Sequence, residues 1–161
     1  MANACISPWN PMGKIILLDS GPLGVVTNPN AAPETLACNQ WVRAQIKRGA
    51  QVLVPEICDY EVRRELLRAR KIRSLIQLEK VKRDFGYLPL TTSVMLKAAE
   101  FWAVARQTGQ PTGHDQALDG DVILAAQAAL LIAVGHEVIV ATNNIIHLAR
   151  FVPAARWQVI P

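Results

Sequence analysis

A short, uninterrupted apolar run, KIILLD at 14–19, ends in a carboxylate and is followed at once by the turn-forming residues SGP. A run of this length without polar alternation is typical of a strand buried on both faces of a parallel sheet. QVLVP at 51–55 and EVIVAT at 137–142 have the same character, and WQVI near the C-terminus is a fourth candidate strand. Strands buried on both faces need helices on both sides of their sheet.

Helical patterns fill the intervals between these runs. The expected helices are 33–48, 56–70, a segment capped by Thr91 or Ser93 that ends at Gly109, and 119–134. The last of these is the most apolar, but Gln127 interrupts it and it is too short to span a bilayer, so a buried core helix is expected. The alternation of strand and helix predicts a three-layer α/β/α fold on a mainly parallel sheet.

The 161 residues fit a single domain, expected over 14–161, with 1–13 as an irregular lead-in that holds two prolines. The lead-in lacks the basic start and long apolar run of a secretory signal, and the three cysteines show no metal-binding spacing. These features predict a cytoplasmic protein with reduced thiols and no membrane span. The net charge of +4 favours an anionic partner such as nucleic acid.

Two carboxylates lie at positions where an unpaired charge would be costly. Asp19 ends the first apolar run, and ligands bind beyond the carboxyl ends of parallel strands, so Asp19 is a candidate metal ligand. The alternative is that Asp19 only caps the turn that follows it. Glu61 falls on the apolar side of its helix, where an acid needs a partner. A salt bridge to Arg64 or Arg68 is the alternative to a functional role.

Asp119 and Asp121 flank Gly120 at the expected start of the apolar helix. Aspartate is a favoured N-cap and first-turn residue, so capping accounts for one of the two. Capping rarely needs both, which leaves the other as a candidate ligand. Asn143 and Asn144 directly follow the third apolar run, where they form a turn or, with Thr142, orient a water molecule or a phosphate.

Several carboxylates without histidine or cysteine ligands make a hard oxygen site, which suits Mg²⁺ or Mn²⁺ rather than zinc. The three histidines of the chain lack the spacing of metal ligands and are expected to be ordinary surface or core residues. Crowded carboxylates repel one another, and a cation relieves that repulsion. The chemistry typical of such a site is hydrolysis of phosphodiester bonds.

Four segments together resemble the motifs of PIN domains, most closely those of the VapC-type toxins of bacterial toxin–antitoxin pairs. The segments are LLDSGPL at 17–23, PEICDYEVRREL at 55–66, DGDVILAAQA at 119–128 and VATNNIIHL at 140–148. The resemblance covers roughly residues 14 to 160 in the family's order. It implies a parallel sheet flanked by helices and a ribonuclease that depends on Mg²⁺ or Mn²⁺. It also implies a homodimer and, for a toxin, inhibition by a small antitoxin.

The resemblance assigns roles position by position. The residues that match the three family acids are Asp19, with Ser20 as its usual hydroxyl neighbour, Glu61 and Asp121. Asp119 is an additional acid in some members and is expected to assist in metal binding. Asn144 falls where many members carry a fourth acid, so weaker binding of a second ion is expected there.

A basic stretch, RREL followed by RARKIR, comes directly after Glu61. It is either a solvated helix face or a row of phosphate contacts along RNA, which would make binding strongly salt-dependent. The residues expected to contact the substrate are Ser20, Arg63, Arg64, Thr142 and Asn143.

Two other functions remain open from the sequence. One is a catalytically weak or inactive PIN-fold module that only binds nucleic acid, which the amide of Asn144 favours. The other is a phosphatase with Asp19 as nucleophile. Such phosphatases usually carry a second aspartate two residues on, where this chain has Gly21.

Overall fold

The computed structural model describes residues 13–109 and 115–161. Its core is a five-stranded, wholly parallel sheet with the strand order β3-β2-β1-β4-β5. The strands are β1 (Ile15–Leu18), β2 (Gln51–Pro55), β3 (Tyr87–Leu88), β4 (Val138–Ala141) and β5 (Ala154–Ala155). The first three predicted strands are therefore confirmed, with β1 at the centre of the sheet.

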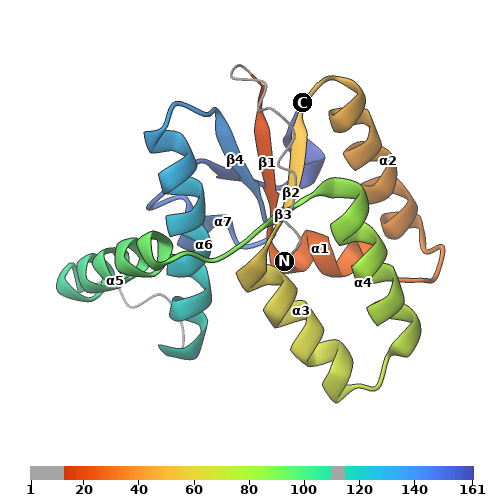
Figure 1. Ribbon diagram of the computed structural model, residues 1–161, viewed down its shortest axis with the longest axis horizontal. Helices are drawn as coiled ribbons and strands as arrows, with labels where there is room; N and C mark the ends of the chain where they lie inside the picture. The colour runs from red at the N-terminus through yellow and green to blue at the C-terminus, as the bar shows by residue number, and fades with distance from the viewer. Residues whose placement is uncertain (1–12, 110–114) are drawn as a thin grey trace, which may run out of the picture.

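Helices cover both faces of the sheet. They are α1 (Ser20–Val26), α2 (Pro33–Lys47), α3 (Glu56–Arg68), α4 (Ile72–Phe85), α5 (Thr92–Gln107), α6 (Asp115–Ala133) and α7 (Ile145–Leu148). Figure 1 shows α5 and α6 on one side of the sheet and α2 and α4 on the other. This is the three-layer α/β/α arrangement that the sequence predicts.

The central strand has no edge and no face open to water. β1 pairs with β2 on one side and β4 on the other, and each of its four side chains is at most 1% exposed. Burying a side chain such as leucine or isoleucine contributes roughly 1.5–3 kcal/mol. The uninterrupted apolar run is thus the sequence of a strand buried on every side, which fixes the position of the residue that follows it.

One helix was not predicted from the sequence, and another begins earlier than predicted. The residues after Asp19 do not form a loop, because the Asp19 side chain accepts a hydrogen bond from the Ser20 N–H at 2.7 Å and caps α1. Pro22 lies in the first turn of this helix, where a missing N–H costs nothing. α6 begins at Asp115, so Asp119 and Asp121 lie inside it. The prediction that one of them caps the helix is wrong.

The predicted fourth strand is also wrong. Residues Trp157–Val159 form a 3-10 helix, and the edge strand is instead β5, just before it. The Trp157 ring packs on Trp41 of α2 with 5.8 Å between centroids, and the Ile160 carbonyl accepts a hydrogen bond from the Trp41 indole at 3.1 Å. A short apolar run is compatible with a strand or a buried turn, and docking onto α2 selects the turn.

The structure identifies the cap of α5 and adds two elements that were not predicted from the sequence. Thr91, not Ser93, caps α5 by accepting from the Val94 N–H at 3.2 Å. α4 and β3 occupy a stretch for which the sequence analysis predicts no element. The predicted lead-in falls largely on residues 1–12, outside the described part of the chain, so the domain boundary stays a prediction. Among the helices that the structure describes, none is long and apolar enough to cross a membrane.

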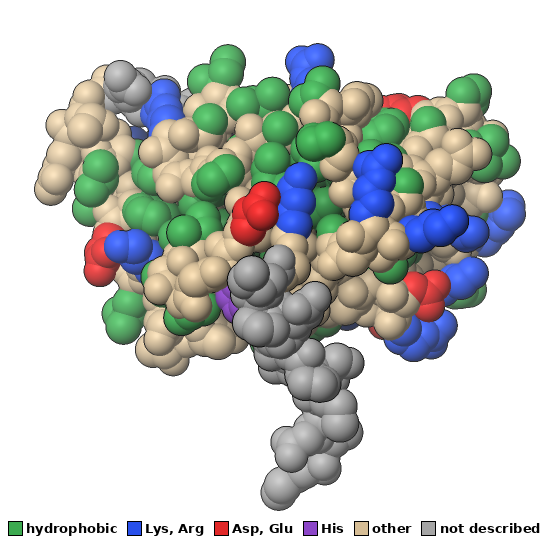
Figure 2. All heavy atoms as spheres, turned by 90° about the horizontal axis from the view of Figure 1, so that it is seen from above, with side chains coloured by type: hydrophobic (Ala, Val, Ile, Leu, Met, Phe, Trp, Pro, Cys, Tyr) green, Lys and Arg blue, Asp and Glu red, His purple; other side chains and the backbone are tan. Residues whose placement is uncertain are grey.

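Some of the basic residues lie at the C-terminal ends of helices. α2 ends at Lys47 with Arg48 as its C-cap, and α4 has Lys82 and Arg83 in its last turn, where the negative end of the helix dipole favours cations. Figure 2 shows Lys and Arg side chains gathered on the right-hand half of the face it views, the side on which α2 and α4 lie in Figure 1. The helix dipoles therefore account for these basic residues, and no bound ligand is needed to explain their presence.

A buried carboxylate fixes α3 against α4 and β3. Asp59 is 6% exposed and accepts hydrogen bonds from Arg63 at 2.9 Å, from the Lys82 ammonium at 3.0 Å and from the Tyr87 hydroxyl at 3.3 Å. Burial, with the nearby negative charge of Asp59 as a second cause, raises the pKa of Tyr87, so that hydroxyl stays a donor. This network holds α3, and hence Glu61, in place.

We expect Asp59→Asn to lower the free energy of unfolding by about 2 kcal/mol, because it removes the buried counter-charge of Arg63 and Lys82 and leaves them only the exposed Glu79. Urea denaturation measures the change. Glu100→Gln is the control, since it breaks only the exposed ion pair with Lys97 and should cost less than about 0.5 kcal/mol. Equal effects of the two substitutions would contradict the role given to Asp59.

Candidate metal centre

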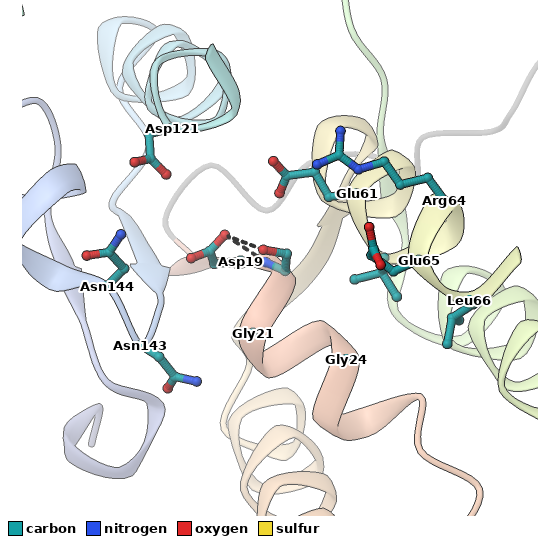
Figure 3. A pocket seen from close by; sticks show the side chains of 12 residues that line it. Asp19, Gly21, Gly24, Glu61, Arg64, Glu65, Leu66, Asp121, Asn143 and Asn144 are labelled. Atoms are coloured by element: carbon teal, nitrogen blue, oxygen red, sulfur yellow. Dashed lines mark hydrogen bonds between the residues drawn. The ribbon is translucent and has the colours of Figure 1, made fainter. Parts of the chain in front are cut away.

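An open cavity of about 760 Å³ lies beyond the carboxyl ends of β1 and β4. Asp19, Glu61, Asp121, Asn143 and Asn144 line it. Figure 3 shows the three carboxylates pointing into the same space from the end of β1, from α3 and from α6. These positions are distant in sequence, and the fold brings them together at the edge of the sheet where the sequence analysis expects a site.

Asp19 is held through both of its carboxylate oxygens. Oδ1 accepts hydrogen bonds from the Ser20 N–H at 2.7 Å and the Ser20 hydroxyl at 3.3 Å, and Oδ2 accepts from the Thr142 hydroxyl at 2.6 Å. Asp19 therefore caps α1 and faces the cavity, so the two roles considered for it are compatible. Thr142 is fully buried, hence it positions Asp19 instead of touching a substrate as predicted.

Glu61 reaches across the cavity to the backbone of α6. A Cβ atom added at Gly120 would lie closer than 3.0 Å to the Glu61 Oε1, so only glycine leaves room for this carboxylate. Within the described part of the chain, no ion pair joins Glu61 to an arginine, and Arg68 pairs with Glu65 at 2.8 Å instead. The salt bridge considered for Glu61 is thus not formed.

Asp121 has a partner that the sequence analysis missed. The Nδ1 atom of His147, on α7, lies 3.1 Å from the Asp121 Oδ2 and 2.9 Å from the Asn144 Nδ2. A single ring nitrogen donates to the carboxylate in one tautomer and accepts from the amide in the other. The one available signal was the spacing of Asn144 and His147, three residues apart, which places them on one side of a helical turn.

The cluster carries more negative charge than its surroundings compensate. Burial raises the pKa of Glu61, and the neighbouring Asp19 and Asp121 raise it further, against the Ser20 hydroxyl and the positive charge of Arg64. Burial also raises the pKa of Asp121, with Asp19 adding to the shift and His147 opposing it. A cation at the centre would remove this cost, so the residues present fit a divalent ion.

Cys58 lies directly behind the acids and was not predicted as a neighbour. Its Sγ is 3.9 Å from the Asp19 Oδ1, and ligand atoms of Asp19, Cys58 and Glu61 all lie within 4.8 Å of one another. Burial raises the pKa of Cys58 well above its ordinary value, and Asp19 and Glu61 raise it further. The residue is therefore a neutral thiol, which leaves carboxylate oxygens as donors and favours Mg²⁺ or Mn²⁺.

Two of the predicted site residues lie elsewhere. Asp119 is exposed and lines a separate apolar hollow between α5 and α6, next to Trp102, so it does not join the other acids. Arg63 points away from the cavity and binds Asp59 and Glu79. By contrast, Ser20, Arg64 and Asn143, which are also expected to contact the substrate, line the cavity. Two residues on a helix must be about one turn apart to share a face, which separates Asp119 from Asp121 and Arg63 from Glu61.

Of the comparisons with known proteins, the one with solved structures finds matches. No protein-family model matches the sequence, and no curated protein does. Among solved structures, the chain is similar to one of VapBC2 from Rickettsia felis bound to a DNA fragment from their promoter. The TM-score is 0.65 at 14% identity, over 89% of this chain and 98% of that chain.

Two further structures match as well. VapBC-1 from nontypeable Haemophilus influenzae gives a TM-score of 0.61 at 14% identity, over 89% of this chain and 98% of that one. DNA-bound VapBC from Salmonella typhimurium gives 0.63 at 18% identity, over 91% and 99%. At such identities the likeness concerns the fold, and it confirms the PIN-like fold expected from the resemblance to VapC-type domains.

The raised pKa values predict how stability depends on pH in EDTA. The ordinary pKa values are 4.5 for Glu61 and 3.8 for Asp121, and both are raised in the folded protein. At a pH between the ordinary and the raised pKa of either group, the folded protein binds more protons than the unfolded chain. The free energy of unfolding should therefore fall as the pH rises through the raised pKa values. Glu61→Gln removes one of these groups, so its stability relative to the wild type should increase with pH. Denaturant titrations at several pH values measure this, and a difference independent of pH would refute it.

Gly120→Ala tests the approach of Glu61 to α6. Alanine is the better helix former by about 1 kcal/mol, and the atom in its way is the end of a flexible side chain, so the variant should fold. Because Glu61 is displaced, affinity for Mn²⁺ should fall by on the order of tenfold, as calorimetry can measure. Gly24→Ala is the matched control, since Gly24 lines the same cavity with nothing within 4 Å of an added Cβ. Unchanged Mn²⁺ affinity in Gly120→Ala would contradict this geometry.

Proposed function

We propose that this chain is a ribonuclease that hydrolyses phosphodiester bonds with Mg²⁺ or Mn²⁺ held by Asp19, Glu61 and Asp121. The observation that carries the proposal is the convergence of three carboxylates, from three separate elements, on one open cavity. The raised pKa values of Glu61 and Asp121 support it, because crowded acids without a compensating cation oppose folding.

Different residues of the cavity bind the metal ion and orient its ligands. When bound, a divalent ion supplies Lewis-acid activation of the phosphate and of the attacking water. Asp19 is oriented for this by Ser20 and Thr142, and Asp121 is oriented by His147. Rigid orientation matters because a ligand displaced by a fraction of an ångström loses much of its effect.

Neutral and positive side chains of the cavity would contact the RNA substrate. Asn143 and Asn144 line the cavity and present amide N–H groups that donate to phosphate oxygens. Arg64 lines it as well and offsets part of the charge of a bound RNA strand. Asn144 replaces the fourth acid of the resembling family, so this chain has one carboxylate fewer for a second ion.

The proposed partners follow from the resemblance and from the similar structures, which are VapBC complexes. We infer that the chain acts in the cytoplasm as the toxin of a toxin–antitoxin pair and that a small antitoxin blocks its activity. We also infer that it forms a homodimer. Large exposed apolar side chains on α5, which are available for such contacts, are Met95, Leu96 and Trp102.

A second function is a nucleic-acid-binding module with little or no catalysis. Asn144 favours it, since an amide cannot supply the charge of a fourth acid. Tight RNA binding without turnover in either metal would support this alternative.

Cleavage of single-stranded RNA in Mn²⁺ tests the proposal. Asp19→Asn and Asp121→Asn should each reduce the rate by at least about a hundredfold, because ligands of one ion act as a unit. Asp119→Asn should stay within about twofold of the wild type, since Asp119 faces a different hollow. Cleavage that persists in EDTA, or in both ligand variants, would rule out a metal-dependent ribonuclease at this site.

A further inference from the structure

We infer a second anion-binding site, at the N-terminus of α4, that binds a phosphate of the same RNA strand away from the bond that is cut. Its assignment to RNA rests on the proposed function. The site is a hollow of about 430 Å³ between the segment that follows α1 and the turn that joins α3 to α4. Asn28, Asn30, Arg70, Lys71, Arg73 and Ser74 line it, and it is called the α4 pocket below.

The cations of the α4 pocket are not neutralised. Arg70, Lys71 and Arg73 form no ion pair within 4.0 Å among the described residues, although Arg63 and Arg68 on α3 are both paired. None of the residues that line the hollow is acidic. A cluster of cations around a concave surface repels itself and attracts an anion.

Backbone donors add to this charge. α4 has 14 residues, its N-cap residue Lys71 makes no side-chain cap, and no acidic residue lies in its first turn. The Ile72 N–H donates to the Arg70 carbonyl at 3.1 Å, but the Arg73 and Ser74 N–H groups have no backbone partner among the described residues and, with the helix dipole, favour a phosphate.

Ser74 is the independent sign of a ligand. The residue is only 7% exposed and lines the α4 pocket, yet its hydroxyl has no hydrogen-bond partner in the part of the chain that the structure describes. The hydroxyl is not among the fully enclosed polar atoms that lack a partner, so it is open to the hollow and a group bound there can reach it. A phosphate oxygen in the hollow would accept this hydrogen bond.

The backbone at Arg70 also favours a functional role. Arg70 has φ 53°, and it is the one described residue other than glycine with positive φ. This is the position at which helices usually end in glycine, which adopts the conformation without cost. Arginine costs about 1 kcal/mol or more here. Because glycine would make the same turn, the turn alone does not explain the cationic side chain.

The distance to the metal centre fits one nucleic-acid strand. Arg68, the last residue of α3, follows Glu61 by seven positions, about 10 Å at 1.5 Å per residue, and Arg70 lies in the turn just beyond it. That is about three nucleotides of stacked strand at 3.4 Å each, to which the turn adds. Two other residues that line the acidic cavity lie on the way to the α4 pocket. Gly24 of α1 lies between Asp19 and Asn28 in the sequence, and Leu66 of α3 lies between Glu61 and Arg70. An RNA strand that lies along these two helices would place one phosphate in each site.

Fluorescence anisotropy with a ten-nucleotide RNA in EDTA measures binding without cleavage. The double variant Arg70→Gly/Arg73→Gln should lose about tenfold in affinity, and the slope of its salt dependence should weaken by about 0.7 for each phosphate that it no longer binds. Arg70→Gly also relieves the positive φ, so loss of folding is not expected. The control, Arg43→Gln/Lys80→Gln, removes the same charge from exposed positions outside the α4 pocket and should change affinity less than twofold.

Ser74→Ala separates a binding role from a structural one. It removes a donor without a partner, so stability should be unchanged or higher, while affinity for the ten-nucleotide RNA should fall severalfold.

The possible outcomes are distinct. Equal losses in the double variant and its control would overturn the α4 pocket as a site, leaving only diffuse attraction. Weakened binding of a poly-glutamate peptide with RNA binding intact would also overturn it and assign the hollow to an acidic protein. RNA binding that depends on the α4 pocket, without cleavage in Mn²⁺, would support the pocket and refute the ribonuclease.

Discussion

The Asp19 carboxylate is the point on which the site depends, because it is fixed by the most deeply buried strand and by donors from two other segments. β1 has no freedom to shift, since it pairs on both edges and packs on both faces. The Ser20 N–H and the Thr142 hydroxyl then hold one oxygen each. The same contacts begin α1 and join β1 to β4, so the fold and the position of the ligand have a common cause.

The cavity is assembled at a cost to stability. Glu61 and Asp121 are half-buried, lie near a third acid and have raised pKa values for both reasons. Gly120 weakens α6 as a helix former and gives Glu61 its space. A chain selected for stability alone would avoid these choices. Together they favour a site whose occupant is a cation, and the network around Asp59 holds α3 in place against the repulsion.

The basic residues fall into groups with different surroundings. Those at the C-terminal ends of α2 and α4 meet helix dipoles, Arg63 pairs with the buried Asp59, and Arg68 pairs with Glu65 on the helix surface. Arg64 faces the acidic cavity, and the cations at the α3–α4 turn face a hollow without acids. One basic stretch in the sequence therefore contains both of the roles considered for it, a solvated helix face and candidate phosphate contacts.

The sequence by itself determined the central strands and most helices, because continuous burial and helical periodicity are local patterns, and it indicated Asp19, Glu61 and Asp121 as acids that line one cavity. It could not determine that α6 begins at Asp115, that WQVI docks on α2 as a turn, or that Asp119 and Arg63 face away from the cavity. His147, Cys58 and Gly120 were missed because their roles come from contacts with residues far away in the chain. Only the tertiary structure decides which side chains share a space, since packing between elements, not sequence distance, sets their separation.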